Sequence, residues 1–361
     1  MGVLAAGAIG MSDRLGAQAP QGRGAAPPPP TVLNLGSLAV TVQSLDASVP
    51  FYRDGLALDL VSPPTAARVD EARNTVMGTP GAGSRTARFA IPNEPFAIEL
   101  IEYTGIDRTP MMAHHNDPGA SFFNVGYLDV GAIFDALRKF NPRMVGQGAL
   151  PTTANPAGLN ATWIRDPDGM IIEVMHGGWD GPLKSFPSVR NAYRAHFGVT
   201  MEQYTQALTF YRDLLGFALT PGFGGGAAGE YRPAGGLSRM LGVPAEANWT
   251  GVEGHCANAH CEMFEFKDAP RTPFRPRAQD PGAVYLSVWV SDLDALLARM
   301  KAAGIDIVTR GGAPVTVSHA GRFDVVSGAG PTGGPTRVNT SRQILVRDPG
   351  GFLVLLMQRL N

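Results

Sequence analysis

The sequence lacks the features of a membrane protein or a nucleic-acid-binding protein. Its 361 residues contain no apolar run of about 18 residues, the length that a membrane-spanning helix needs. Lys and Arg number 30 against 31 Asp and Glu, and this balance predicts no polybasic surface for nucleic acid or an anionic membrane. A G-x-S-x-G nucleophile motif, a P-loop and a dinucleotide-binding fingerprint are also missing. We therefore expect the partner to be a small molecule, with no nucleic acid and no membrane.

Cysteine is scarce, and the N-terminus leaves a related question open. Cys256 and Cys261 are close enough in sequence for a small-loop disulfide if the protein is exported; two unpaired thiols are the alternative. Residues 3–11 form a short apolar run, and residues 17–19 resemble a cleavage site, but no Lys or Arg precedes the run. We expect residues 1–31 to be a disordered tail that ends in a Pro/Ala linker, or a remnant of a signal peptide. The location is then cytoplasmic or, with a signal peptide, periplasmic or secreted.

Abundant Gly and Pro divide the chain into short elements that repeat. Residues 31–42 alternate in polarity and are rich in β-branched side chains, which predicts a strand; an amphipathic helix and three more strands follow. Pro50 lies early in that helix and favours an N-cap at Asp46 or later over one at Ser44. The pattern then restarts, so residues 33–178 contain two β-α-β-β-β units.

The second half of the chain repeats the first. Residues 210–213 (Phe-Tyr-Arg-Asp) end a predicted helix, as residues 51–54 do with the same four letters. Residues 347–351 (Arg-Asp-Pro-Gly-Gly) match residues 165–169 (Arg-Asp-Pro-Asp-Gly), a strong turn signal between two β runs. The sequence therefore predicts four β-α-β-β-β units.

These four units, the Phe-Tyr-Arg-Asp helix ends and the Arg-Asp-Pro-x-Gly turns resemble the vicinal oxygen chelate superfamily. That superfamily includes glyoxalase I, bleomycin- and fosfomycin-resistance proteins and extradiol dioxygenases. The resemblance implies an α+β fold in which pairs of units curl into cup-shaped mixed sheets. It makes the chain a tandem-domain member, with one glyoxalase-like domain over residues 32–180 and a second over residues 186–361. It also implies a divalent metal in a cup, polarising two adjacent oxygens of a substrate.

The resemblance assigns each unit one ligand position in its first strand and one in its last. In chain order these positions hold Ser37 and Glu99, Phe122 and Glu173, His196 and Glu262, and Tyr285 and Leu355. Pairing the second unit with the third brings together one imidazole and two carboxylates, which suit Zn, Ni, Mn, Co or Fe. We therefore predict a metal site of Glu173, His196 and Glu262. The first and fourth units would then form a cup without an imidazole, either a binding pocket or a structural element.

The same positions favour one reaction class over another. Extradiol dioxygenases use two histidines and a glutamate in their C-terminal half, where this chain has His196, Tyr285 and Leu355. Lyase or isomerase chemistry fits better, with Glu173 or Glu262 moving a proton. The alternative is a non-catalytic, resistance-type binding protein with degenerate metal sites. Units that pair across chains, as glyoxalase-type proteins allow, would make the protein a homodimer.

Other histidines lie outside this set. His114 and His115 occupy a predicted loop before the second unit, where we expect solvent exposure, with a lid contact as the alternative. His255 and His260 each precede a cysteine, but the spacing fits no zinc motif. His260 and Glu262 share a face of their strand, because side chains two residues apart point to the same side.

Overall fold

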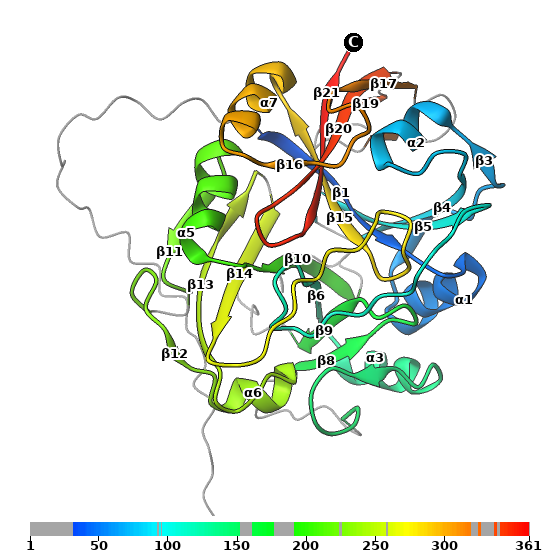
Figure 1. Cartoon of the computed structure of the whole chain (residues 1–361). Coiled ribbons are helices and arrows are strands. Elements are labelled where there is room, and N and C mark those ends of the chain that lie inside the picture. The colour runs from blue at the N-terminus through cyan, green and yellow to red at the C-terminus, as the bar shows by residue number, and fades with distance from the viewer. Residues whose placement is uncertain are drawn as a thin grey trace, which may run out of the picture.

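The structure is a computed structural model (Figure 1). It describes residues 32–360 except residues 92, 93, 95, 152–160, 177–190, 224, 225, 258, 319–323, 326–335, 338 and 339. The predicted tail and signal-peptide pattern, residues 1–31, lie outside the described residues. None of the described helices is both long and apolar enough to cross a membrane.

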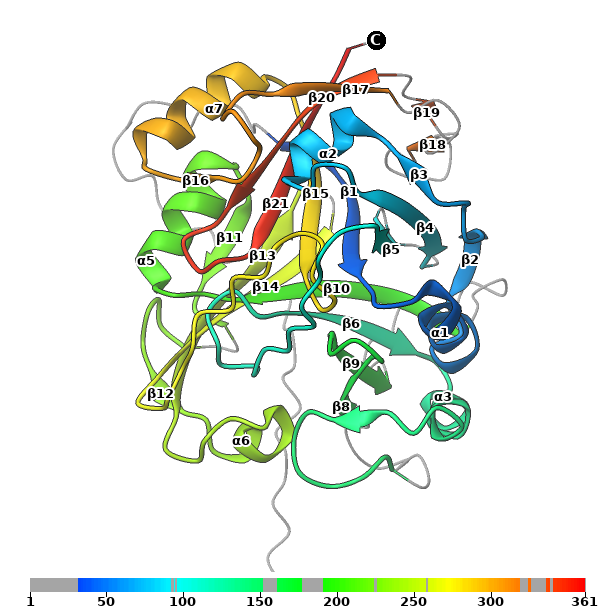
Figure 2. The same cartoon turned by 45° about the vertical axis from the view of Figure 1, so that its right-hand side comes forward.

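Two mixed sheets form the molecule (Figure 2). Sheet A joins, in spatial order, β16 (Asp306–Ile307), β20 (Thr340–Arg347), β21 (Leu353–Arg359), β15 (Val284–Val290), β1 (Val32–Thr41), β5 (Ala97–Thr104), β4 (Gly83–Ala90) and β2 (Asp59–Ser62), with β17 (Val315–Ser318) beside β20 and β3 (Arg68–Val69) beside β4. Sheet B joins β11 (Ala218–Pro221), β13 (Asn248–Cys256), β14 (Ala259–Lys267), β10 (Ala192–Thr200), β6 (Ser121–Tyr127), β9 (Ile171–His176), β8 (Ala161–Arg165) and β7 (Arg143–Met144), with β12 (Arg232–Pro233) beside β13. A separate pair consists of β18 (Asp324–Val325) and β19 (Thr336–Arg337). The predicted α+β class with glyoxalase-like mixed sheets is confirmed, and both sheets are open.

Each sheet takes one unit from each half of the chain. The first strand of the first unit, β1, lies antiparallel to β15 of the fourth, and β6 of the second unit lies antiparallel to β10 of the third. The first and last strands of each unit are parallel neighbours, as in the pairs β1–β5 and β10–β14. The sheets therefore do not coincide with the division into residues 32–180 and 186–361, which stays a prediction about domains.

A helical segment follows the first strand of each unit. These segments are α1 (Leu45–Pro50) with a π-helical turn (Phe51–Gly55), α3 (Val130–Arg138), α5 (Tyr204–Ala207) with a π-helical turn (Leu208–Leu214), and α7 (Leu293–Ala302). In Figures 1 and 2, α1 lies beside α3 and α5 beside α7, at opposite ends of the sheets. Two helices that the sequence did not predict, α2 (Glu71–Met77) and α6 (Gly236–Leu241), lie in the first and third units.

The first helix begins earlier than predicted. Its N-cap is Ser44 and not Asp46. The amide of Leu45 donates to a carboxylate oxygen of Glu102 at 2.9 Å, which satisfies a helix-end donor that would otherwise need a capping side chain. Pro50 closes the regular part of the helix, and the wider π-helical turn follows directly.

The repeated motifs join neighbouring units. Tyr52 of the first Phe-Tyr-Arg-Asp segment donates its hydroxyl proton to Asp166 at 2.8 Å, and Tyr211 of the second donates to Asp348 at 2.8 Å. The two aspartates belong to the Arg-Asp-Pro-x-Gly turns, and all four side chains are buried. Buried polar groups need hydrogen-bond partners, and each tyrosine–aspartate pair supplies them for its own two members. Their role is therefore structural.

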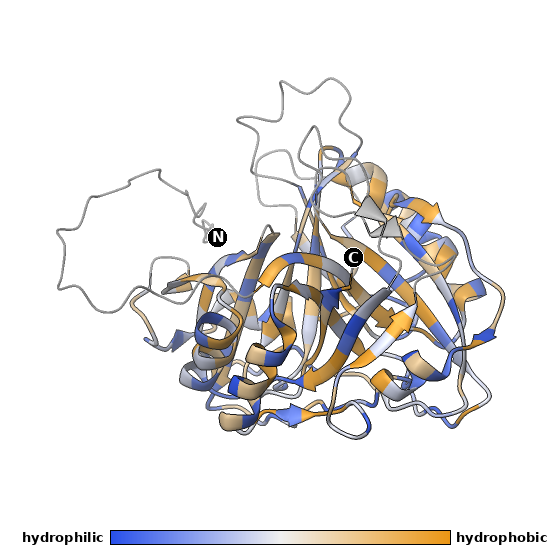
Figure 3. Cartoon of the chain, turned by 90° about the horizontal axis from the view of Figure 1, so that it is seen from above, coloured by the Kyte–Doolittle hydropathy of each residue, from blue (hydrophilic) through white to orange (hydrophobic). Residues whose placement is uncertain are grey.

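The main core lies between the sheets and beneath the four helices. It is one continuous cluster that draws on both sheets, and Figure 3 shows hydrophobic residues concentrated along the strands. The opposite side of each sheet has a separate, smaller cluster. We call the side of sheet A that packs with α2 face A, and the side of sheet B that packs with α6 face B. The predicted ligand positions of the first and fourth units lie on face A, and those of the second and third units lie on face B.

Candidate metal centre

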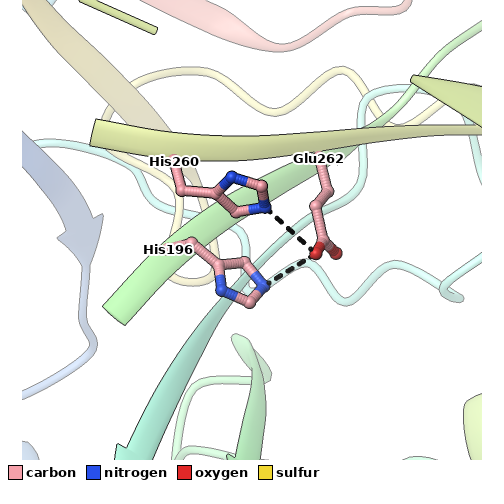
Figure 4. Close-up of side chains that lie close together, drawn as sticks. All are labelled: His196, His260 and Glu262. Carbon is pink, nitrogen blue, oxygen red and sulfur yellow. Dashed lines mark ion pairs between the residues drawn. The ribbon is translucent and has the colours of Figure 1, made fainter. Parts of the chain in front are cut away.

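His196 and Glu262 meet on face B. His196 lies in β10 and Glu262 in the neighbouring strand β14, where it pairs in register with Gly198. Because side chains two residues apart share a face, His196 points to the same side as Glu262. Nε2 of His196 is 3.3 Å from Oε1 of Glu262 (Figure 4). The structure thus brings together two of the three predicted ligands.

His260 completes the group. It precedes Glu262 by two positions in β14, and its Nε2 is 3.4 Å from the same carboxylate oxygen. Figure 4 shows both imidazoles directed at that oxygen, and one ligand atom from each of the three residues lies within 4.8 Å of the others. We predicted that His260 shares a face of its strand with Glu262, but we did not assign it as a ligand. The only signal was its two-residue spacing from Glu262.

A disulfide holds the hairpin that carries His260 and Glu262. Cys256 of β13 and Cys261 of β14 are joined, with their Cα atoms 6.0 Å apart, and both side chains are buried. Of the two alternatives for these cysteines, the structure has the disulfide. Cys261 lies between His260 and Glu262 in sequence, and the cross-link to β13 fixes the register of the hairpin.

The charges of these side chains are strongly coupled. Burial by itself raises the pKa of Glu262, but the imidazoles of His196 and His260 outweigh burial and hold the pKa at about 2. Burial lowers the pKa of His196, whereas the carboxylates of Glu262, Glu173 and Glu94 raise it, and the net pKa lies above its ordinary value. Glu262 is thus ionised near neutral pH, and its charge favours the protonated form of His196.

The donor set fits a divalent metal. Nε2 of His196 is buried and, despite its 3.3 Å distance from Glu262, makes no hydrogen bond of good geometry. Both imidazoles converge on one oxygen of Glu262, so a cation among the three side chains would contact ligand atoms from all of them. Two imidazoles and one carboxylate are ligands for Zn, Mn, Fe, Co or Ni. A bound cation would replace the proton on His196.

Glu173 lies beside this group without belonging to it. It is in β9 and pairs in register with Asn124 of β6, which in turn pairs with His196 of β10. Nδ2 of Asn124 donates to Oε2 of Glu173 at 2.8 Å. Burial raises the pKa of Glu173 to about 7; His196 lowers it and the charge of Glu262 raises it further. Its assignment as a metal ligand stays a prediction, and its position also suits a proton-transferring carboxyl.

Aromatic rings cover the rest of face B. Phe122, at the second unit's predicted ligand position, packs against Trp163 with ring centroids 4.9 Å apart and lies 6.3 Å from the ring of His196. His115 stacks on Phe122 at 5.3 Å. The expected exposure is therefore wrong for His115, because these rings bury it, whereas His114 is exposed. Burial lowers the pKa of His115 to about 3, so it is neutral.

Comparisons with known proteins agree with this architecture. Residues 194–356 match the model of the Glyoxalase/Bleomycin resistance protein/Dioxygenase superfamily. No curated protein matches the chain in sequence. Glyoxalase I from Zea mays is similar in structure, with 14% sequence identity, a TM-score of 0.51, and coverage of 90% of this chain and 92% of that chain. A mutant of the same enzyme gives 15% identity, a TM-score of 0.53 and the same coverage. These structures share the fold, and the resemblance predicted from the sequence is confirmed.

Proposed function

We propose that this glyoxalase-like protein is a metal-dependent enzyme that acts on a small organic substrate with two adjacent oxygens, by lyase or isomerase chemistry. The observation that supports it most is the convergence of His196, His260 and Glu262 next to Glu173, a second carboxyl with a pKa of about 7. A purely structural ion pair needs no second titratable carboxyl near it. Perturbed pKa values grouped in one place are typical of catalytic sites.

His196, His260 and Glu262 would hold the metal. When bound, a divalent ion supplies a Lewis acid that polarises the substrate oxygens. The three side chains provide one negative charge and two neutral nitrogens, which leaves coordination positions for two substrate oxygens. Glu262 is the better ligand of the two predicted catalytic glutamates, because a pKa of about 2 keeps it ionised.

Glu173 would move the proton. A base is most effective when its pKa is near the working pH, and burial brings Glu173 to about 7. It would remove a proton from the carbon beside a carbonyl and return it to the neighbouring carbon, so the isomerisation balances without another reactant. Asn124 would hold the carboxylate in place through its 2.8 Å hydrogen bond. Phe122 and Trp163 would pack against the apolar part of the substrate and keep water out.

Metal analysis tests the proposal first. We expect full-length protein, purified without chelator, to contain about one divalent metal per chain by mass spectrometry, as in other single-metal sites. His260→Ala and Glu262→Gln should be purified with much less metal, whereas the exposed His114→Ala should retain it and serves as the matched control. Protein that holds no metal and shows no thermal shift with added divalent ions would contradict the proposal.

A non-catalytic binding protein is the second candidate, and the aromatic surface of face B favours it. Phe122, Trp163 and Phe264 form contacts that suit a flat ligand. Tight binding of an aromatic compound to metal-free protein, unchanged in His260→Ala, would support this candidate. Metal-dependent turnover of a 2-oxoaldehyde thiol adduct, lost in Glu173→Gln, would support the enzyme.

A further inference from the structure

Face A contains a pocket, and the candidate metal centre lies in the other sheet. A cavity of about 30 Å³ lies among β1, β4, β5, β15 and β21. Its polar lining includes Ser37, Arg73, Arg88, Glu99 and Tyr285. A cavity of this size has room for about two water molecules, so only a ligand of a few heavy atoms would fit.

One arginine of the pocket is already neutralised. Arg73 reaches in from α2, and its Nη2 donates to the hydroxyl of Tyr285 at 3.0 Å and lies 3.8 Å from Oε1 of Glu99. Arg73 and Glu99 are only 6% and 4% exposed. Ser37 donates its hydroxyl proton to the other oxygen of Glu99, at 3.3 Å. These contacts form a fixed wall with no net charge.

Additional positive charge lies at this wall. Arg88 of β4 pairs in register with Glu99, and burial lowers its pKa, as expected for a cation without full compensation. Its hydrogen bond to the carbonyl oxygen of Gly36 is 3.5 Å long, at the limit for such a bond. Arg359 stacks on the indole of Trp289, another residue of the lining, at 5.3 Å. The pocket therefore favours an anion.

The wall also presents an acceptor. Oε1 of Glu99 is buried and accepts no hydrogen bond from the described residues; its nearest cation, Arg73, is at 3.8 Å. A buried carboxylate oxygen left in this way is costly, and a ligand hydroxyl would satisfy it. Arg88 and Glu99 are cross-strand neighbours, so an anion and a hydroxyl on adjacent ligand atoms could reach both.

We propose that this pocket binds a small hydroxycarboxylate, with the carboxylate paired to Arg88 and the hydroxyl donating to Oε1 of Glu99. Guanidinium groups match carboxylates in geometry as well as charge. The ligand must be short, because the cavity accepts only a few heavy atoms. The site needs no metal and is independent of the function proposed for face B.

Titration calorimetry on full-length, chelator-treated protein tests the proposal. The probes are glycolate, acetate, which lacks the hydroxyl, and glycolamide, which lacks the charge. We expect glycolate to bind at least about tenfold more tightly than either of the others, the loss expected when a charge-assisted hydrogen bond is removed. Absence of glycolate binding, or equal binding of the three probes, would overturn the proposal.

Three variants locate the binding. Arg88→Gln should weaken glycolate binding at least about tenfold, whereas Arg68→Gln, on the exposed strand β3, should leave it unchanged. Glu262→Gln, which removes a candidate metal ligand on face B, should also leave it unchanged. Retained affinity in Arg88→Gln would refute the assignment, and so would affinity that is lost in Glu262→Gln. Neither result depends on whether face B binds a metal.

Discussion

Faces A and B are built from equivalent units, yet they compensate the negative charge of their equivalent glutamates in different ways. On face A, Glu99 faces the guanidinium of Arg73, whose charge is permanent. On face B, the equivalent Glu262 faces the imidazoles of His196 and His260, which can give up a proton. A carboxylate beside a permanent cation has little affinity for a metal, whereas one beside imidazoles gains two more ligands. The partner of the glutamate therefore decides which face suits a metal.

The largest effect should come from removing the compensation on face A. Glu99→Leu leaves Arg73 buried without its carboxylate and should lower the free energy of unfolding by about 3–5 kcal/mol. Urea unfolding followed by circular dichroism measures it. The double variant Arg73→Met/Glu99→Leu should recover most of the loss, because no charge is then left buried. A single variant as stable as the double one would contradict this account of face A.

The matching change on face B should alter metal binding. Glu262→Gln keeps the size of the side chain but removes the charged ligand, and we expect metal affinity to fall by at least about 100-fold, beyond the loss seen when an outer-shell partner is removed. Metal titration with a competing chelator measures the affinity. Glu99→Gln is the control, and its metal affinity should equal that of the unchanged protein. Equal losses in both variants would mean that the two faces do not differ as proposed.

The disulfide is a further difference between the faces. Replacing both Cys256 and Cys261 by Ser opens a small loop, and we expect the free energy of unfolding to fall by about 2 kcal/mol. Thermal unfolding measures this loss. Metal affinity should decrease as well, because the hairpin positions His260 and Glu262, whereas glycolate binding on face A should not change. A variant with unchanged stability and metal affinity would exclude a role for the cross-link.

A further effect concerns pH. The pKa of Glu173 is raised to about 7 in the folded protein, so the folded state holds its proton more tightly than the unfolded chain does. The stability from this group is complete below the ordinary carboxyl pKa and is lost as the pH rises through about 7. Metal-free protein should therefore lose thermal stability between pH 5 and pH 8 relative to Glu173→Gln, roughly over the interval between the two pKa values. Parallel curves would show that Glu173 titrates normally.

Local patterns made the fold predictable. The alternation of residues 31–42 and the repeated Phe-Tyr-Arg-Asp and Arg-Asp-Pro-x-Gly motifs depend on near neighbours in sequence, and they identified the four units. The pairing of the units depends on contacts between distant strands, so the sequence could only list the combinations. The start of the first helix was predicted wrongly because Glu102, which lies in β5, accepts the hydrogen bond from the first amide of the helix.

The candidate metal centre was predictable only in part, because local patterns give positions within a unit but not contacts between strands. His196 and Glu262 followed from their places in the unit, and the structure brings them together. His260 was not assigned, because its role depends on two rings converging across neighbouring strands. Arg73 was not foreseen either, since it reaches face A from the inserted helix α2. The difference between the two faces therefore depends on contacts between residues far apart in the chain, which no spacing in the sequence encodes.

X-ray absorption spectroscopy of zinc-loaded protein tests the central claim most directly. The three proposed ligands predict a zinc ion with two imidazoles and one carboxylate, and with one imidazole fewer in His260→Ala. The exposed control His114→Ala should give the spectrum of the unchanged protein. A zinc spectrum without imidazole scattering, or one that is identical in His260→Ala, would contradict the assignment of His196, His260 and Glu262 as the metal centre.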